Sequence, residues 1–225
     1  MGFKTILVAN RGEIAIRIMR TAKDLGIITV AVYSEDDFES LHRTMADDSY
    51  GLEGQGILAY LDMDRIIEIA KEAEADAIHP GYGFLSENAN FARKCEENGI
   101  VFIGPDIRHL ELFGNKGTAR AAAAAADVPI LKGIDESVTL EQAQAFYESL
   151  PCESGMMIKA VGGGGGRGSR AVSDESSIGS AYKRCKSEAT RAFGNGDLYV
   201  EQFVKNARHI EVQILGDSSG EIVHL

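Results

Sequence analysis

Short apolar stretches rich in β-branched residues alternate with amphipathic stretches through the first hundred residues. The apolar stretches lie at residues 5–10, 28–34, 76–80 and 100–104, and the helix-like stretches at 11–26, 63–75 and 87–98. Strands that alternate with helices of roughly ten to fifteen residues predict a parallel sheet with helices on both faces. We therefore expect an α/β, Rossmann-like domain over residues 1–113.

The first helix-like stretch carries an apolar stripe. Ile14, Ile18 and Leu25 fall on one helical stripe, and Gly26 is a stop signal. The start of this helix, "RGEIAIR", has the form of an anion-binding helix N-terminus, but Arg11 and Glu13 can equally pair with each other. We assign these two residues no chemistry.

The pattern changes near Phe113, and we expect a second domain over residues 114–225. An alanine-rich helix stopped by Pro129 comes first, then a helix at 138–149, strands at 155–161 and 169–173, a helix at 174–193 and a strand at 198–204. Residues 208–225 predict a hairpin of two alternating strands around residues 217–220. Its first strand would place His209, Glu211 and Gln213 on one face, with Ile210, Val212 and Ile214 facing a core. Because the chain stops at Leu225 inside a strand pattern, we expect a fragment.

Charge and cysteine usage limit the partners and the compartment. The formal net charge of −11 disfavours nucleic acid and anionic membranes, so an anionic ligand needs a local cationic pocket. Three cysteines without a CxxC pair predict reduced thiols rather than a disulfide framework or a zinc site. No stretch is apolar and long enough to span a bilayer, and no signal or transit peptide precedes the first strand. We expect a cytoplasmic protein, with the mitochondrial matrix as the alternative for a eukaryotic source.

The stretch "KAVGGGGGRGSRAV", residues 159–172, is the strongest candidate for a binding site. A P-loop would continue into Gly-Lys-Ser/Thr and a helix, whereas here a strand-like "SRAVS" follows; a dinucleotide fingerprint fails for the same reason. A linker would normally be Ser-rich and join separate units. We favour a flap at residues 162–166, in which backbone N–H groups without side chains in the way can approach a polyphosphate.

Two strands near the glycines carry further candidates. Alternation places Lys159 on the face opposite Ile158 and Ala160, where its ammonium could neutralise phosphate charge or could simply meet solvent. In the strand at 198–204, backbone groups beside Glu201 could pair with an adenine edge, although most strand glutamates have no such role.

Six blocks together are similar to a known family. They are "VANRGEIAIRI" (8–18), "HPGYGFLSEN" (79–88), "FIGP" (102–105), "FGNK" (113–116), "IKAVGGGGGRGSR" (158–170) and "RHIEVQIL" (208–215). In order and spacing, the whole chain resembles the biotin carboxylase component of biotin-dependent carboxylases, in the ATP-grasp superfamily. The resemblance implies a pre-ATP-grasp domain followed by the first part of an ATP-grasp fold, with the flap subdomain at about 131–203.

The resemblance also implies the site residues. Lys116 and Lys159 match the two lysines that contact the ATP phosphates, and Gly164, Gly165 and Gly166 fall in the flap. Glu201, Gln202, Phe203 and Val204 match the segment that holds adenine through its backbone. His209 matches a histidine that contacts the nucleotide.

The implied activity is that of an ATP-dependent carbon–nitrogen ligase. ATP activates bicarbonate as carboxyphosphate, and the released CO₂ carboxylates biotin on a carrier protein or domain; a carboxyltransferase and a homodimer are further implied partners. The catalytic residues and the magnesium ligands would follow Leu225, so we expect neither in this chain and expect it to be inactive alone.

Two other functions stay open at this stage. One is another ATP-grasp ligase, such as half of a carbamoyl-phosphate synthetase, against which "HPGYGFLSEN" and the glycine run argue. The other is a non-catalytic fragment that only binds nucleotide. The block "HPGYGFLSEN" itself is either a structural turn or, as the resemblance implies, a neighbour of the active-site cleft. The final carboxyl acceptor is not predicted by the sequence.

Overall fold

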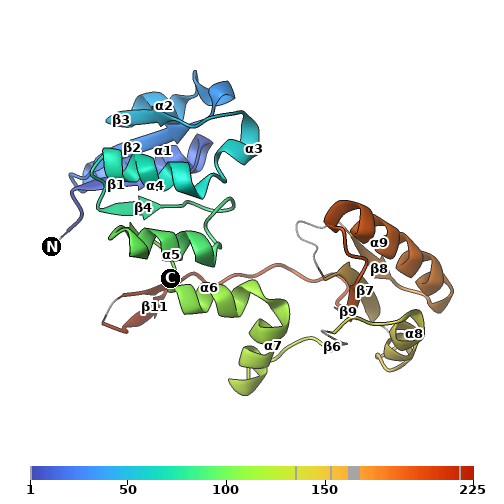
Figure 1. Cartoon of the computed structure of the whole chain (residues 1–225). Coiled ribbons are helices and arrows are strands. Elements are labelled where there is room, and N and C mark those ends of the chain that lie inside the picture. Colours follow the sequence, from blue (N-terminus) through green and yellow to red (C-terminus); the bar gives the residue numbers. More distant parts are fainter. Residues whose placement is uncertain (1, 135, 153, 162–167, 218) are drawn as a thin grey trace. The chain divides into compact units, whose positions relative to one another are not determined.

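The computed structural model describes residues 2–134, 136–152, 154–161, 168–217 and 219–225. The chain forms two compact units, Met1–Ala119 and Arg120–Leu225, each with its own sheet (Figure 1). The helices are α1 Gly12–Asp24, α2 Leu41–Met45, α3 Gly56–Ala59, α4 Met63–Glu72, α5 Ala89–Glu97, α6 Ile107–Gly114, α7 Lys116–Ala125, α8 Leu140–Glu148 and α9 Ile178–Phe193, with short 3₁₀ turns at Glu35–Asp37 and Glu175–Ser177. The strands are β1 Thr5–Val8, β2 Ile28–Tyr33, β3 Asp48–Gly51, β4 Ala77–His79, β5 Val101–Phe102, β6 Gly133–Ile134, β7 Gly155–Ala160, β8 Ser169–Val172, β9 Leu198–Phe203, β10 Ile214–Gly216 and β11 Ile222–His224.

The first unit is a parallel α/β sheet, as its alternating pattern predicts. Its strand order is β3-β2-β1-β4-β5, and every neighbouring pair is parallel. The chain builds outward from β1 to β2 and β3, and then returns to place β4 on the other side of β1. This reversal is the topological switch point of a doubly wound sheet, where ligands bind beyond the carboxyl ends of the strands.

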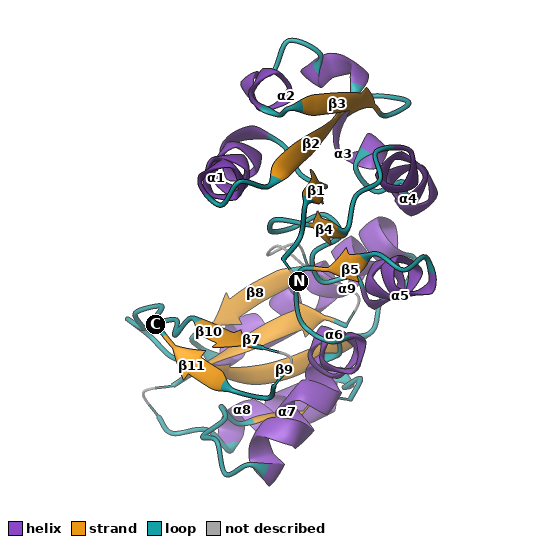
Figure 2. Ribbon diagram, turned by 90° about the vertical axis from the view of Figure 1, so that its left-hand side faces the viewer, coloured by secondary structure: helices purple, strands orange, loops and turns teal. Residues whose placement is uncertain are grey.

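Helices cover both faces of this sheet, and two core clusters result. Ile6 and Val8 of β1 pack with α1 on one face, while Leu7 packs with α4 and α5 on the other. The helices on opposite sides of the sheet are visible in Figure 2. The period of two along β1 thus supplies apolar side chains to both layers, which a buried parallel strand requires.

The stripe predicted for the first helix is wrong in detail. The buried residues of α1 are Ala15, Met19 and Ala22, whereas Leu25 lies beyond the helix and is 70% exposed. Ile18 is half-buried at the edge of the contact. Small side chains at 15 and 22 let the helix approach the sheet closely, so the helix is rotated away from the stripe that its largest residues define.

Residues 35–62 contain elements that the sequence does not indicate. They form α2, α3 and the edge strand β3, whose sequence Asp-Ser-Tyr-Gly has no apolar alternation. β3 exists because its backbone pairs with β2, Val30 opposite Asp48. An edge strand needs one hydrogen-bonding neighbour and little burial, so its side chains carry a weak signal.

The second unit has an antiparallel sheet with the strand order β6-β9-β7-β8. One face is covered by α8 and α9 over a core that includes Phe146, Ile158, Cys185 and Val200. The predicted strands on both sides of the glycine run are confirmed as β7 and β8. Helix α9 ends at Gly194, which has the left-handed conformation (φ +71°). Its N–H donates to the Thr190 carbonyl in the last turn of the helix.

The predicted hairpin near the C-terminus is only partly correct. β10 and β11 pair antiparallel with Ile214 opposite His224, but residues 207–213 are not a strand. Ile210, Val212 and Ile214, which the alternation places against a core, are 72%, 62% and 54% exposed. Alternation alone does not make a strand, because the backbone also needs a partner strand, and among the described residues none pairs with 207–213.

Within the described part of the chain, no helix has the length and apolar character needed to cross a membrane.

Candidate functional site

Lys159 lies on the face of the second unit's sheet opposite to the one that α8 and α9 cover. Its neighbours Ile158 and Ala160 are 0% and 1% exposed and point into the core. Lys159 stands opposite Tyr199 of β9 and Ser169 of β8. Directly opposite residues of an antiparallel pair share a face, so the alternation predicted for this strand is confirmed.

The ammonium of Lys159 forms an ion pair with the carboxylate of Glu201. Glu201 stands opposite Met157, so the two charged residues are diagonal neighbours on one face of β7 and β9. Their side chains are 29% and 22% exposed, and such a partly screened pair has modest strength. The structure thus joins two residues that the sequence proposes separately, one for phosphate and one for adenine.

Lys159 is also next to the base of the glycine-rich hairpin. The Ala160 N–H donates to the Gly168 carbonyl at 2.9 Å, and Lys159 pairs in register with Ser169. Gly164, Gly165 and Gly166 lie outside the described residues. The backbone of Lys159 therefore lies beside the points at which β7 ends and β8 begins, while its ammonium pairs with Glu201, which stands opposite Met157.

The end of β9 carries the other predicted adenine-contacting residues. Phe203 shares the face of Lys159 and Glu201 and lies over Gly155, where a Cβ would come within 3.1 Å of the Phe203 ring. Gln202 points to the opposite face, and its Nε2 donates to Ser154 Oγ at 3.0 Å. Its backbone N–H donates to the Lys132 carbonyl at 2.8 Å. Val204, just past the strand, is 44% exposed.

The other two predicted nucleotide-contacting residues, Lys116 and His209, come from other elements. Lys116 is the exposed first residue of α7 and lies in the first unit. His209 lies in the irregular segment after β9, with its Nε2 3.0 Å from Glu211 Oε1 and its side chain 83% exposed. Whether either residue contacts nucleotide stays a prediction.

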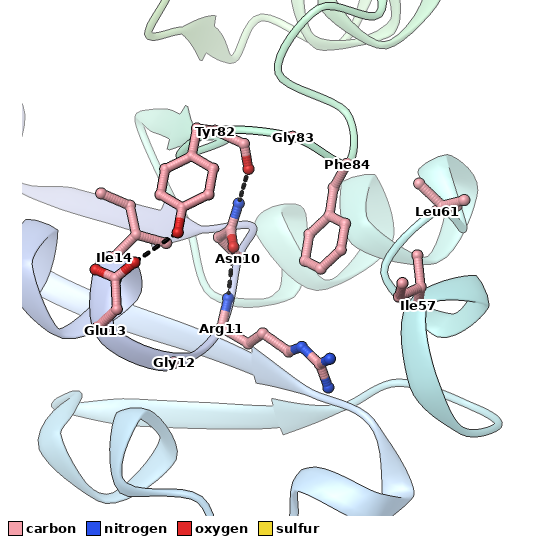
Figure 3. A pocket seen from close by; sticks show the side chains of 10 residues that line it. All are labelled: Asn10, Arg11, Gly12, Glu13, Ile14, Ile57, Leu61, Tyr82, Gly83 and Phe84. Carbon is pink, nitrogen blue, oxygen red and sulfur yellow. Dashed lines mark hydrogen bonds between the residues drawn. The ribbon is translucent and has the colours of Figure 1, made fainter. Parts of the chain in front are cut away.

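A cavity of about 580 Å³ lies in the first unit at the switch point (Figure 3). Most of its lining comes from two of the quoted sequence blocks, residues 8–18 and 79–88, and from the sequence we assign no chemistry to the first. It is lined by Asn10, Arg11, Gly12, Glu13, Ile14, Ile57, Leu61, Tyr82, Gly83 and Phe84. The sequence could have predicted this cavity, because residues that directly follow β1 and β4 of a doubly wound sheet meet at one edge of the sheet.

Around this cavity, Arg11 and Glu13 each pair with another residue rather than with each other, which was one alternative from the sequence. Arg11 Nη1 lies 2.9 Å from Asp37 Oδ2, and Glu13 accepts a hydrogen bond from the Tyr82 hydroxyl at 2.5 Å. Burial of Asp37 alone would raise its pKa, but hydrogen bonds from Arg11, Tyr60 and Ser40 outweigh burial and lower the pKa to about 2. Asp37 therefore stays ionised and holds the Arg11 guanidinium.

No group of three or more His, Cys, Asp and Glu side chains is placed to hold a metal ion within the described ranges.

Two known protein families match the chain, one over its first half and one over its second half. Residues 2–110 match the family described as "Biotin carboxylase, N-terminal domain", and residues 115–225 match "Carbamoyl-phosphate synthase L chain, ATP binding domain". Pyruvate carboxylase of Staphylococcus aureus is 53% identical over 227 residues, and the human mitochondrial pyruvate carboxylase is 50% identical over 226. Both alignments cover 99% of this chain and 19% of the relative, so the chain spans about a fifth of their length.

Solved structures of biotin carboxylases are similar to this chain over its whole length. The biotin carboxylase domain dimer of Hydrogenobacter thermophilus 2-oxoglutarate carboxylase, in complex with MgADP, ADP and bicarbonate, matches with a TM-score of 0.90 and 44% identity, covering 100% of this chain and 49% of that one. The Campylobacter jejuni biotin carboxylase complex with β,γ-ATP has a TM-score of 0.89 and 43% identity, covering 99% and 50%. The chain belongs to the biotin carboxylase family, with a biotin carboxylase N-terminal domain followed by ATP-grasp sequence.

Proposed function

We propose that these residues form the nucleotide-binding amino-terminal part of a biotin carboxylase. In the proposed reaction, ATP activates bicarbonate as carboxyphosphate, and the resulting CO₂ carboxylates the ureido nitrogen of biotin on a carrier. The observation that carries the proposal is Lys159, which lies at the base of the glycine-rich hairpin and on the same sheet face as Glu201 and Phe203. The likeness to biotin carboxylase structures with bound nucleotide supports it.

Each residue has a distinct role in the proposal. Lys159 and Lys116 neutralise phosphate charge, and the backbone N–H groups of Gly164, Gly165 and Gly166 approach the phosphates. The backbone of Glu201, Gln202, Phe203 and Val204 pairs with the adenine edge, and His209 contacts the nucleotide. Phosphoryl transfer depends mainly on positioning and charge neutralisation, which lysines and bare glycine amides provide.

Magnesium would supply further neutralisation of the polyphosphate when bound. The chain covers about half of the matched biotin carboxylase structures, and we propose that the magnesium ligands and the catalytic residues belong to the other half. A biotin carrier, a carboxyltransferase and a second copy are the partners that we propose, and the cytoplasm is the proposed compartment.

Calorimetric titration of the 225-residue chain with ATP, with and without magnesium, tests the nucleotide site. We expect Lys159→Ala to weaken ATP binding by roughly tenfold, since hydrogen bonds to charged groups contribute about 1.5–3 kcal/mol. Lys183→Ala, on the exposed side of α9, is the matched control and should bind as the wild type does. Equal weakening by both variants would count against a specific phosphate contact.

The family name matched by residues 115–225 keeps a carbamoyl-phosphate synthetase activity as the second candidate. Biotin distinguishes the two. A complete enzyme that carries this chain should cleave ATP faster when free biotin is added, whereas a carbamoyl-phosphate synthetase would not respond to biotin.

A further inference from the structure

His79 is the last residue of β4, and its side chain lies on the α1 side of the sheet. Ala77, two residues earlier, packs in the cluster between the sheet and α1, whereas Ile78 packs in the cluster on the opposite face. The period of two along the strand therefore places His79 on the face that α1 covers. There it lines a groove of about 470 Å³.

The imidazole of His79 accepts a hydrogen bond from the turn that follows it. The Gly81 N–H donates to Nδ1 at 3.0 Å. A backbone N–H can only donate, so Nδ1 carries no proton and the neutral ring keeps its proton on Nε2. A doubly protonated ring would direct an N–H at the Gly81 N–H. This contact therefore exists only while the imidazole is neutral.

Gly81 is closely confined on its other side. Its φ is +67°, and a Cβ on this residue would lie 2.6 Å from Asn10 Nδ2. Asn10 follows β1, is 3% exposed, and donates from Nδ2 to the carbonyls of Pro80 at 2.7 Å and Tyr82 at 2.9 Å. Asn10 thus holds two carbonyls of the turn at residues 80–84, and His79 holds the amide between them.

The same turn leads into the switch-point cavity (Figure 3). The Tyr82 hydroxyl donates to Glu13, and the Phe84 ring stacks on Tyr60 with centroids 5.2 Å apart. Phe84 has a φ of 45°, which a bulky L-residue keeps only where its surroundings hold it. Loss of the acceptor for the Gly81 amide would therefore disturb side chains that line the cavity.

The groove around His79 favours the neutral ring. Its lining includes the aliphatic side chains of Ile14, Ile18, Ile27 and Ile103. Burial among them lowers the pKa of His79 below its ordinary value of 6.5. The ring is consequently neutral at pH 7 and meets its titration range only in acid.

Few charged groups share this groove with His79. Arg17 of α1 and Tyr82 of the turn are its titratable lining residues, and Tyr82 is bonded to Glu13 of the same helix. The strands on either side of β4, which are β1 and β5, contain no charged residue. Among these described neighbours, no carboxylate is bonded to the ring to stabilise its protonated form.

We propose that His79 is a positioning residue whose neutral imidazole holds the Gly81 amide, and that protonation in acid releases the turn at residues 80–84. His79 contacts no reacting atom in this proposal; it acts through Gly81 on Tyr82 and Phe84. An open turn leaves the ring closer to its ordinary pKa of 6.5 than the closed turn does. The closed turn is therefore fully favoured above pH 6.5 and is lost as the pH falls below that value.

Amide exchange of the 225-residue chain, followed by NMR, tests the contact. The protection factor of the Gly81 amide should be about three- to tenfold lower at pH 5 than at pH 7.5, as expected for the loss of one hydrogen bond. The Phe91 amide is the internal control, because Asn88 Oδ1 accepts from it at 3.0 Å and does not titrate. Equal protection of Gly81 at the two pH values would overturn the proposal.

Two substitutions separate the proton from the acceptor. In His79→Asn, the side-chain Oδ1 takes roughly the place of Nδ1 and accepts at every pH, so Gly81 should stay protected at pH 5. His79→Ala has no acceptor and should show at pH 7.5 the low protection that wild type shows at pH 5. His109→Asn, at an exposed position, is the matched control and should follow wild type. If Gly81 in His79→Asn loses protection in acid as wild type does, another group opens the turn and the proposal is wrong.

A complete biotin carboxylase that carries this chain tests the consequence for activity, and this test rests on the proposed function. The rate of His79→Asn relative to wild type should rise about three- to tenfold from pH 7.5 to pH 5, because the variant keeps the turn closed. A constant ratio would overturn the positioning role even where the turn opens. A wild type without bicarbonate-dependent ATP cleavage would instead refute the proposed function, while the exchange data still decide whether His79 holds the turn.

Discussion

Glu201 shows how a single charged residue can limit the site it belongs to. Its carboxylate pairs with the Lys159 ammonium, so phosphate must compete with it. We predict that Glu201→Gln tightens ATP binding about two- to fivefold, the range expected for a partly exposed ion pair. Calorimetric titration measures the change.

Glu188→Gln is the matched control for this prediction. Glu188 pairs with Arg170 on the helix-covered side of the same sheet, so its loss should leave ATP binding unchanged. Weaker binding by Glu201→Gln would mean that the carboxylate orients Lys159 for phosphate rather than competing for it.

His42 illustrates a buried titratable group in the first unit. It is 1% exposed, its Nε2 lies 3.2 Å from the Val32 carbonyl, and its Nδ1 has no described partner. Burial lowers the pKa of His42 below its ordinary value of 6.5 and outweighs the Val32 hydrogen bond and the Asp37 charge, which raise the pKa. Folding therefore favours the neutral ring, and the unfolded chain binds the additional proton.

Stability of the first unit should consequently fall in acid. The stability that comes from neutral His42 is complete above pH 6.5 and is lost as the pH falls below that value. We predict that the free energy of unfolding of the first unit decreases from about pH 7 to about pH 5, by at most about 1.4 kcal/mol per pH unit for each histidine. His42→Gln should flatten the slope in urea unfolding, whereas His109→Gln, at an exposed position, should not. An unchanged slope in His42→Gln would exclude His42 as the cause.

At the scale of elements, β7 depends on a glycine at its first position. A Cβ on Gly155 would lie 2.8 Å from the Val172 carbonyl oxygen and 3.1 Å from the Phe203 ring. Gly155→Ala should therefore lower the free energy of unfolding of the second unit by about 1–3 kcal/mol, the usual cost of overpacking. Denaturant unfolding with a probe in this unit measures the loss.

Gly179 provides the opposite case in the same unit. It lies in α9, and no atom comes within 4 Å of an added Cβ. Gly179→Ala should stabilise the unit by up to about 1 kcal/mol through reduced freedom of the unfolded chain. If both alanines destabilise equally, space at Gly155 is not the reason for glycine there.

At the scale of the whole molecule, the two units have separate cores. The clusters around Leu7 and Ile6 lie within the first unit, and the cluster around Ile158 lies within the second. We predict that Leu7→Ala and Ile158→Ala each cost about 2–5 kcal/mol, and that each loss is confined to the unit concerned. Hydrogen exchange should show faster exchange in β1, β2 and β4 for Leu7→Ala, and in β7 and β9 for Ile158→Ala. Parallel loss of protection in both units for either variant would show that they unfold as one.

The sequence by itself predicted the features that follow from local periodicity. The alternation of strands and helices identified the parallel sheet, and the period of two in β7 placed Lys159 on the face opposite Ile158. Both follow from the geometry of a strand, which is the same wherever the strand lies. The block pattern identified the family.

Tertiary structure decided everything that depends on a distant partner. Lys159 meets Glu201, 42 residues away, and Asn10 holds carbonyls 70 and 72 residues away, which no local pattern reveals. The buried side of α1 was set by close packing of Ala15 and Ala22 against the sheet rather than by its largest apolar residues. Residues 207–213 alternate as a strand does, yet none forms there in the described chain, since a strand requires a neighbouring strand for its backbone hydrogen bonds.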